Sequence, residues 1–407
     1  MNKKLYRIIA TAPSAFAFPE HQGLVFGNEV PKEDDPVVRV AVSTVWQGFP
    51  PLSMVPLPVA IQLTADVWAS NLDEVVPLAD EVLIGFVDTL AVCVNAAIGV
   101  PQAQCIFDIE PPDRNRELRE YFRPIDYPMA RPIRCQSPDL LHEPLRSLYL
   151  ARQSYEIGLA IAHYKAALSF FGTSQLIFAF ESLCIATEIL GEPFVQRELN
   201  RRSMPINNKS VKRLAKELGH YSTEDPVSNW RNRLYDDILV RMIFESDRDL
   251  YKKVGKGTNG FEHGSMPPTE IRSIAQETIQ RLFILLRRAF FDLAELDSIS
   301  MNQILPWAPV GLDPVRDHID VKFTSVDESV DEAVSGPSLA PTLGMAQKIV
   351  AAEIVEDYLR IERSLRLQPD LGIGTEVTDI QYSMSSPYNV LGTAKRSSPG
   401  PSATRPS

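Results

Sequence analysis

The sequence is poor in the residues that mark disulfide-rich and metal-binding proteins. Its 407 residues include four cysteines, and none of these forms a CxxC pair. The six histidines are scattered along the chain. A disulfide framework and a structural zinc site both need cysteine or histidine ligands at close, regular spacing. We therefore expect reduced thiols, no metal site and no cofactor.

Long apolar runs and an excess of positive charge are also missing. We find no uninterrupted run of 18 apolar residues, so no transmembrane helix is expected. Arg7 and Pro13 break the apolar stretch that follows the basic start, which argues against a secretory signal peptide. The formal net charge is −11, whereas a duplex DNA binder needs excess Lys and Arg. These features predict a cytoplasmic protein that binds neither membranes nor duplex DNA.

The sequence pattern changes near residue 140. Before it, short runs rich in Val, Pro and aromatic residues, such as VVRVAVSTVW at 37–46, predict strands. Residues 72–98 differ, because their apolar side chains recur at three- and four-residue steps and predict a helix. We expect an α+β domain over residues 1–140, whose role the sequence does not name.

From residue 145 to 297 the apolar residues recur at helical spacing. We expect a domain boundary between 138 and 145, followed by an all-α bundle of four or five principal helices. The predicted helices cover about 145–171, the stretch between Gly172 and Gly191, VKRLAKELG at 211–219, a segment from Val227 onward, and 269–296.

Beyond residue 310 the composition turns acidic and then rich in Ser and Pro. Such composition does not supply enough apolar surface for a packed core. Residues 310–407 are therefore predicted to form a linker, one amphipathic helix over 345–367, and a disordered C-terminal tail.

Residues 257–264, GTNGFEHG, are the most informative segment for function. They predict a glycine-rich loop that carries Asn259, Glu262 and His263 just before the last long helix. A neutral imidazole is the usual general base near pH 7, and backbone N–H groups at a helix N-terminus can hold a phosphate. The alternative is a structural connector, in which the glycines make tight turns and His263 bonds to a carbonyl. Three lysines lie just upstream and would help to hold an anion: Lys252, Lys253 and Lys256.

A helical bundle with Asn, three residues, His and Gly before its last long helix resembles the HEPN superfamily. Asn259, His263 and Gly264 match that motif, and Glu181 in IFAFESLCIATEIL matches the family's Glu. The stretch from VSNWRNRLYDD to GTNGFEHG is similar to uncharacterised bacterial members, among them ApeA-like defence proteins and the J-type protein of methylamine-utilisation clusters. The resemblance covers residues 145–297. It implies a metal-independent endoribonuclease or RNA binder in bacterial defence or stress, and a homodimer through the bundle.

One position departs from the family motif, because Thr258 stands where active members have an Arg. That Arg stabilises the phosphate transition state, and losing such a charged donor costs orders of magnitude in rate. Lys256, Arg231 or Arg241 could replace it, although a lysine lacks the bidentate fork of arginine.

Two functions therefore stay open. One is an RNA-directed domain, and the other is a non-catalytic interaction or dimerisation protein in which the NGFEHG loop is structural. For the first function the catalytic candidates are Asn259, Glu262 and His263. The binding candidates are Lys253, Lys256, Glu181 and Arg241.

Overall fold

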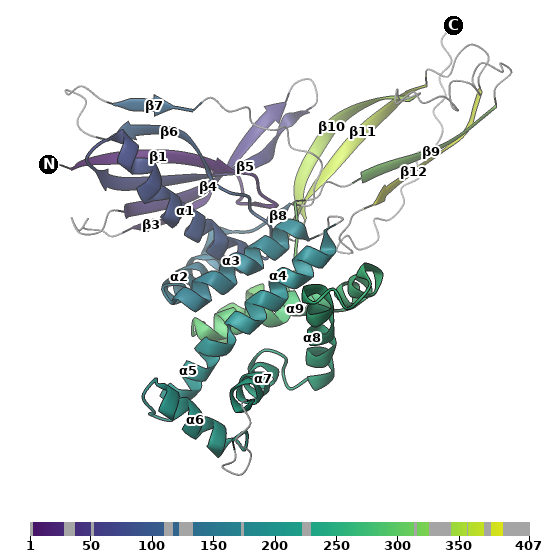
Figure 1. Cartoon of the computed structure of the whole chain (residues 1–407). Helices are drawn as coiled ribbons and strands as arrows, with labels where there is room; N and C mark the ends of the chain where they lie inside the picture. The colour runs from purple at the N-terminus through teal and green to yellow at the C-terminus, as the bar shows by residue number, and fades with distance from the viewer. Residues whose placement is uncertain are drawn as a thin grey trace, which may run out of the picture.

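A computed structural model shows the protein as a β-sheet region joined to a group of helices (Figure 1). The structure describes residues 3–27, 37–49, 53–109, 117–121, 133–171, 175–221, 229–312, 316–324, 343–355, 357–369 and 376–385. This mix of sheet and helix confirms the α+β composition that the sequence predicts.

The strands that precede residue 140 join a ten-stranded sheet in the order β2-β8-β11-β10-β5-β1-β6-β7, and β4 and β3 extend from β5. Their bounds are β1 Lys4–Ala12, β2 Phe16–Ala17, β3 Gly23–Gly27, β4 Val37–Phe49, β5 Ser53–Ala69, β6 Gln102–Asp108, β7 Leu118–Glu120 and β8 Arg134–Cys135. Every second residue of β1 from Tyr6 to Ala12 is buried, so the sheet has one apolar face.

Helix α1 (Leu72–Val94) covers this apolar face (Figure 1). Its first turn is capped by the Asn71 side chain, which accepts hydrogen bonds from the backbone N–H groups of Asp73 and Glu74. Ten consecutive residues at its C-terminal end, 85–94, are buried. The helix predicted over 72–98 is thus confirmed over residues 72–94. Asn95 ends it in a left-handed conformation with φ of 48°.

Helices follow from residue 142 to 304, and their bounds differ from the expected ones within 145–171, at Gly191 and over 248–262. They are α2 His142–Ala151, α3 Tyr155–Phe170, α4 Leu176–Ile189, α5 Gly191–Arg201, α6 Asn208–Glu217, α7 Trp230–Met242, α8 Arg248–Glu262, α9 Pro268–Leu293 and α10 Ser298–Ile304. The single helix predicted over 145–171 is two helices, because the chain turns at 152–154 and restarts after Ser154. Gly191 does not end a helix but begins α5, where its missing Cβ leaves room for the Tyr235 ring.

The predicted boundary at 138–145 coincides with the change from strand to helix, yet one hydrophobic core runs through both regions. The same cluster of buried side chains contains Ile8 of β1, Leu90 of α1, Leu183 of α4 and Phe290 of α9. The helices therefore pack on the sheet region through α1.

The helix predicted over 345–367 is wrong, because the described residues of this segment are strands. β10 (Leu343–Val355) and β11 (Tyr358–Pro369) form an antiparallel hairpin that joins the sheet at β5 and β8. Leu359 packs with Ile133 and Cys135, so contacts with distant residues override the local helical periodicity. A further pair, β9 (Arg316–Thr324) and β12 (Glu376–Ser385), forms a separate two-stranded sheet. The predicted Ser/Pro-rich linker at 325–342 and the tail from residue 386 lie outside the described residues.

The carboxyl end of α1 is held by a buried arginine from α9. The Arg287 guanidinium donates to the carbonyl oxygens of Val92 and Cys93, each at 2.9 Å. It also donates to the Trp307 carbonyl at 3.2 Å. Carbonyls at a helix C-terminus carry partial negative charge, which stabilises a cation placed there. Complete burial nevertheless lowers the pKa of Arg287 to about 10.

A second buried arginine joins the same helix end to the C-terminal hairpin. The Arg134 guanidinium of β8 donates to the carbonyl of Asn95 at 3.2 Å and to that of Val94. It also donates to the Tyr358 hydroxyl at 2.6 Å and to the Ala308 carbonyl at 2.7 Å. The Tyr358 ring lies 5.2 Å from the guanidinium carbon, within the range of a cation–π interaction. Segments far apart in the sequence therefore meet at the end of α1.

Candidate functional site on helices α4 and α8

The segment predicted to be a glycine-rich loop is mostly helical. Helix α8 continues through Glu262, and His263 is its C-cap residue. Only Gly264, with φ of +58°, adopts the left-handed conformation that ends the helix. The prediction of a loop over 257–264 is therefore wrong. The prediction that these residues stand at a helix N-terminus is wrong as well, because they form the C-terminal end of α8. They lie at the negative end of the α8 dipole, which does not attract a phosphate.

Two of the three glycines of α8, Gly257 and Gly260, serve close packing rather than turns. A Cβ added to Gly257 would lie 2.9 Å from the Phe180 ring and 3.2 Å from the Ile274 side chain. A Cβ added to Gly260 would lie 2.7 Å from the Met266 Cβ. Between these glycines Thr258 is buried, and its hydroxyl donates to the Val254 carbonyl at 3.1 Å. The position of the motif arginine thus faces the packed interior of the bundle.

Replacing Gly257 by Ala is expected to lower the free energy of unfolding by about 1 kcal/mol. The new methyl group overpacks the Phe180 ring at a cost of about 1–3 kcal/mol, and the higher helix propensity of Ala returns about 0.5–1 kcal/mol. Gly255 is the matched control, since a Cβ there meets nothing within 4 Å and Ala should stabilise the chain. Urea denaturation of the two variants should give shifts of opposite sign, and equal shifts would contradict the packing argument.

The three catalytic candidates stand at the exposed end of α8. Asn259, Glu262 and His263 are all exposed. The backbone N–H of His263 donates to the Asn259 carbonyl at 3.1 Å, as part of the helix end. In the described part of the chain the imidazole makes no hydrogen bond or ion pair. The alternative in which His263 is buried and bonded to backbone is therefore wrong.

The lysine candidates of α8 do not converge on these residues. Lys253 pairs with Glu277 and Lys256 pairs with Glu270 at 3.0 Å, and both carboxylates belong to α9. The positive charges predicted to hold a phosphate are thus directed along the α8–α9 contact and are already neutralised.

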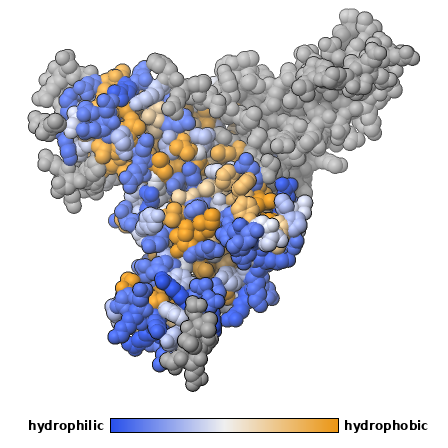
Figure 2. Space-filling model, in the orientation of Figure 1, coloured by the Kyte–Doolittle hydropathy of each residue, from blue (hydrophilic) through white to orange (hydrophobic). Residues whose placement is uncertain are grey.

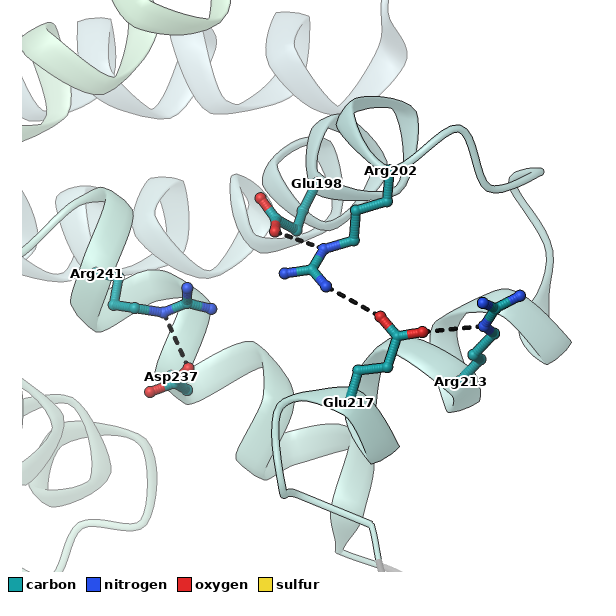
Figure 3. A network of polar contacts seen from close by, with 6 residues as sticks. All are labelled: Glu198, Arg202, Arg213, Glu217, Asp237 and Arg241. Carbon is teal, nitrogen blue, oxygen red and sulfur yellow. Dashed lines mark hydrogen bonds and ion pairs between the residues drawn. The ribbon is translucent and has the colours of Figure 1, made fainter.

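The arginine candidate of α7 is also engaged. Arg241 donates to Asp237 of its own helix at 3.0 Å (Figure 3). Asp237 in turn lies 3.3 Å from His220 and 3.6 Å from Arg248. Figure 3 shows this pair beside a chain of ion pairs in which Arg202 joins Glu198 to Glu217. The structure therefore does not bring Arg241 together with the α8 candidates as a phosphate clamp.

Glu181 is the one binding candidate that the fold places in an unusual environment. Its side chain is 8% exposed, and its Oε2 atom is buried without a hydrogen-bond partner among the described residues. Burial raises the pKa of this carboxyl to about 7, and the charges of Glu262 and Glu188 add to the effect. A carboxylic acid with such a pKa is poised to gain or lose its proton near neutral pH.

The sequence reasoning missed the other acidic residues around Glu181. Glu188 has a raised pKa, first through desolvation and then through the charges of Glu262 and Asp236. Asp236 of α7 accepts a hydrogen bond from the Tyr251 hydroxyl at 2.7 Å. We call the set Glu181, Glu188, Glu262 and Asp236 the acidic seam. The spacing of Glu181 and Glu188, seven residues apart on one helix, was the available signal, since such residues share a face.

Aromatic side chains border the acidic seam at one end. Phe178 of α4 is 51% exposed, and its ring centroid lies 6.1 Å from that of Phe261 on α8. The Phe170 ring of α3 lies on its other side, also at 6.1 Å. Phe178 lies three residues before Glu181 on α4, a spacing that places both side chains near one face of the helix, and Phe261 precedes Glu262 on α8. Figure 2 shows apolar residues gathered at the surface over α4. We call these three phenylalanines the aromatic border.

Metal binding and membrane crossing find no support in the part of the chain that the structure describes. No three His, Cys, Asp or Glu side chains there are grouped so that they could hold a metal ion. No described helix is both long and apolar enough to cross a membrane. The four cysteines form no disulfide with one another. Comparison with protein family models, curated proteins and solved structures finds no match to this chain.

Proposed function

We propose that residues 145–297 form a HEPN-like helical bundle that acts as a non-catalytic interaction module. The observation that carries the proposal is the charge around the candidate motif. The charges that act on Glu181 among the described residues come from Glu262 and Glu188, and both are negative. A phosphoryl transition state needs positive charge and hydrogen-bond donors at the reacting oxygens. An acidic site without an arginine repels it instead.

The position of Thr258 supports the same conclusion. Its hydroxyl is bonded to the Val254 carbonyl inside the α8 helix, so this side chain does not reach a ligand at the surface. The position of Glu181 supports the HEPN-like part of the proposal. The family resemblance pairs this Glu with the motif, and in the fold Glu262, which lies between the matched Asn259 and His263, acts on its pKa.

A specific observation favours a second candidate, which is RNA cleavage or RNA binding. The imidazole of His263 is exposed and carries no bond in the described part of the chain, so a substrate could reach it. A neutral imidazole can serve as a general base. This candidate needs a cation in place of the motif arginine, and the candidate lysines Lys253 and Lys256 are paired with α9 carboxylates.

An RNase assay with the His263→Ala variant separates the two candidates. The interaction module predicts that purified protein leaves a labelled single-stranded RNA intact and that the variant behaves identically. The free energy of unfolding should change by less than about 0.5 kcal/mol, because the imidazole is exposed. Metal-independent cleavage by the wild type that the variant loses would overturn the proposal. The homodimer through the bundle stays a prediction, which light scattering measures.

A further inference from the structure

The acidic seam contains a buried carboxylate, Glu181, on which no positive charge among the described residues is found to act. Glu181 is 8% exposed, and its buried Oε2 has no hydrogen-bond donor among the described residues. A buried carboxylate without a donor costs free energy, and a cationic donor is the partner that removes this cost. Glu188 and Glu262 lie at the surface beside it. A cation arriving from solvent would therefore contact exposed carboxylates first and act on Glu181 behind them.

The two candidate lysines of α8 do not supply this charge. Lys253 and Lys256 pair with Glu277 and Glu270, on the side of α8 that contacts α9. Helix α8 thus carries neutralised charges toward α9 and uncompensated carboxylate charge toward α4. The contrast lies within a single helix, so it does not arise from the acidic composition of the whole chain.

The aromatic border defines the kind of cation. A guanidinium group is planar, stacks on aromatic rings and donates to a carboxylate through two parallel N–H groups. The exposed Phe178 ring and the neighbouring Phe261 ring offer such a surface on the two helices that carry Glu181 and Glu262. A divalent cation fits less well, since the described residues hold no group of three metal-binding side chains.

We propose that the acidic seam and the aromatic border together bind an arginine-bearing peptide segment of a partner protein. The arginine stacks on Phe178 and pairs with Glu262, and further basic residues of the segment follow the seam along α4 toward Glu188. This inference rests on the proposed function, since it names the partner of the interaction module. Nucleic acid is not expected to bind here, because the carboxylates of the acidic seam repel its phosphates.

The test uses a labelled nine-residue peptide with three arginines and otherwise alanine and leucine. Its reference is the same peptide with citrulline, which keeps the shape of arginine and removes the charge. We expect saturable binding of the arginine peptide to the full chain at low ionic strength, measured by fluorescence anisotropy. The citrulline peptide should bind at least about tenfold more weakly, as for the loss of one close ion pair.

Two charge-matched double variants locate the site. Glu188→Gln with Glu262→Gln should weaken binding of the arginine peptide at least about fivefold. Glu270→Gln with Glu277→Gln changes the net charge equally, at carboxylates already paired with lysines, and should change the affinity less than about twofold. Phe178→Ala should weaken binding without changing the net charge.

Three results would overturn the inference: no saturable binding of the arginine peptide, equal binding of the citrulline peptide, or equal losses in the two double variants. The RNase assay on the same preparations keeps the two proposals apart. Cleavage that depends on His263 overturns the non-catalytic function. Intact RNA together with failed peptide binding overturns only the identity of the partner.

Discussion

Replacing the buried Arg287 by Met is expected to lower the free energy of unfolding by about 3–5 kcal/mol. The thioether fills part of the space but donates no hydrogen bonds. The Cys93 carbonyl would then lose its donor inside the core, and the carbonyls of Val92 and Trp307 would keep only the hydrogen bonds that Asn95 donates to them. Urea denaturation followed by circular dichroism measures this loss directly.

The neighbouring residue provides the control for this experiment. Arg288 is partly exposed and pairs with Glu245 at the surface. Exposed ion pairs contribute about 0–1 kcal/mol, so Arg288→Met should leave the chain nearly as stable as the wild type. A loss of similar size in both variants would show that the end of α1 does not depend on Arg287.

Replacing Glu181 by Gln is expected to stabilise the chain at pH 8 and to leave its stability almost unchanged at pH 5. The folded state raises the pKa of this carboxyl from 4.5 to about 7, so the folded chain binds the proton more tightly than the unfolded chain. Unfolding therefore releases a proton between these values, and the contribution of Glu181 to stability falls as the pH rises through this window. Each pH unit corresponds to about 1.4 kcal/mol, and partial access of water reduces the total to about 2 kcal/mol.

The measurement is a series of urea denaturation curves from pH 5 to pH 8. The residues that act on Glu181 are Glu262 of α8 and Glu188 of α4, and both disfavour its ionisation. Glu277→Gln is the matched control, because that exposed carboxylate is paired with Lys253. The free energy of unfolding of the Glu277→Gln variant should depend on pH in the same way as that of the wild type. Parallel profiles of the wild type and Glu181→Gln would refute the unusual environment of this carboxyl.

Much of the secondary structure could be predicted where a local pattern and burial agree. Strand β1 alternates strictly between buried and half-buried residues, and α9 carries apolar side chains at helical steps over its whole length. The C-terminal hairpin could not be predicted in this way. Its strands depend on pairing with β5 and β8, whose residues lie more than 200 positions away in the sequence.

The candidate site shows why glycine is an ambiguous signal. The cluster of glycines in 255–264 predicts a loop, since glycine commonly marks turns. In the fold, Gly257 and Gly260 instead permit close contact with Phe180 and Met266, and only Gly264 needs a positive φ. Glu181 was found through the family resemblance, as the Glu within the apolar run IFAFESLCIATEIL. The pairing of Lys253 and Lys256 with α9 depends on helix packing, which the sequence pattern does not contain.

The meeting of segments at the end of α1 also constrains how the protein is made. Arg134 binds the Tyr358 hydroxyl across 224 residues of sequence, and Arg287 binds the Val92 carbonyl across 195. Contacts of such long range form slowly, because a large loop must close before they contribute. During synthesis the apolar sheet face and α1 leave the ribosome before the hairpin that completes the sheet, which emerges only after Pro369. Until then the nascent chain carries an unfinished sheet edge, a state that favours protection by chaperones.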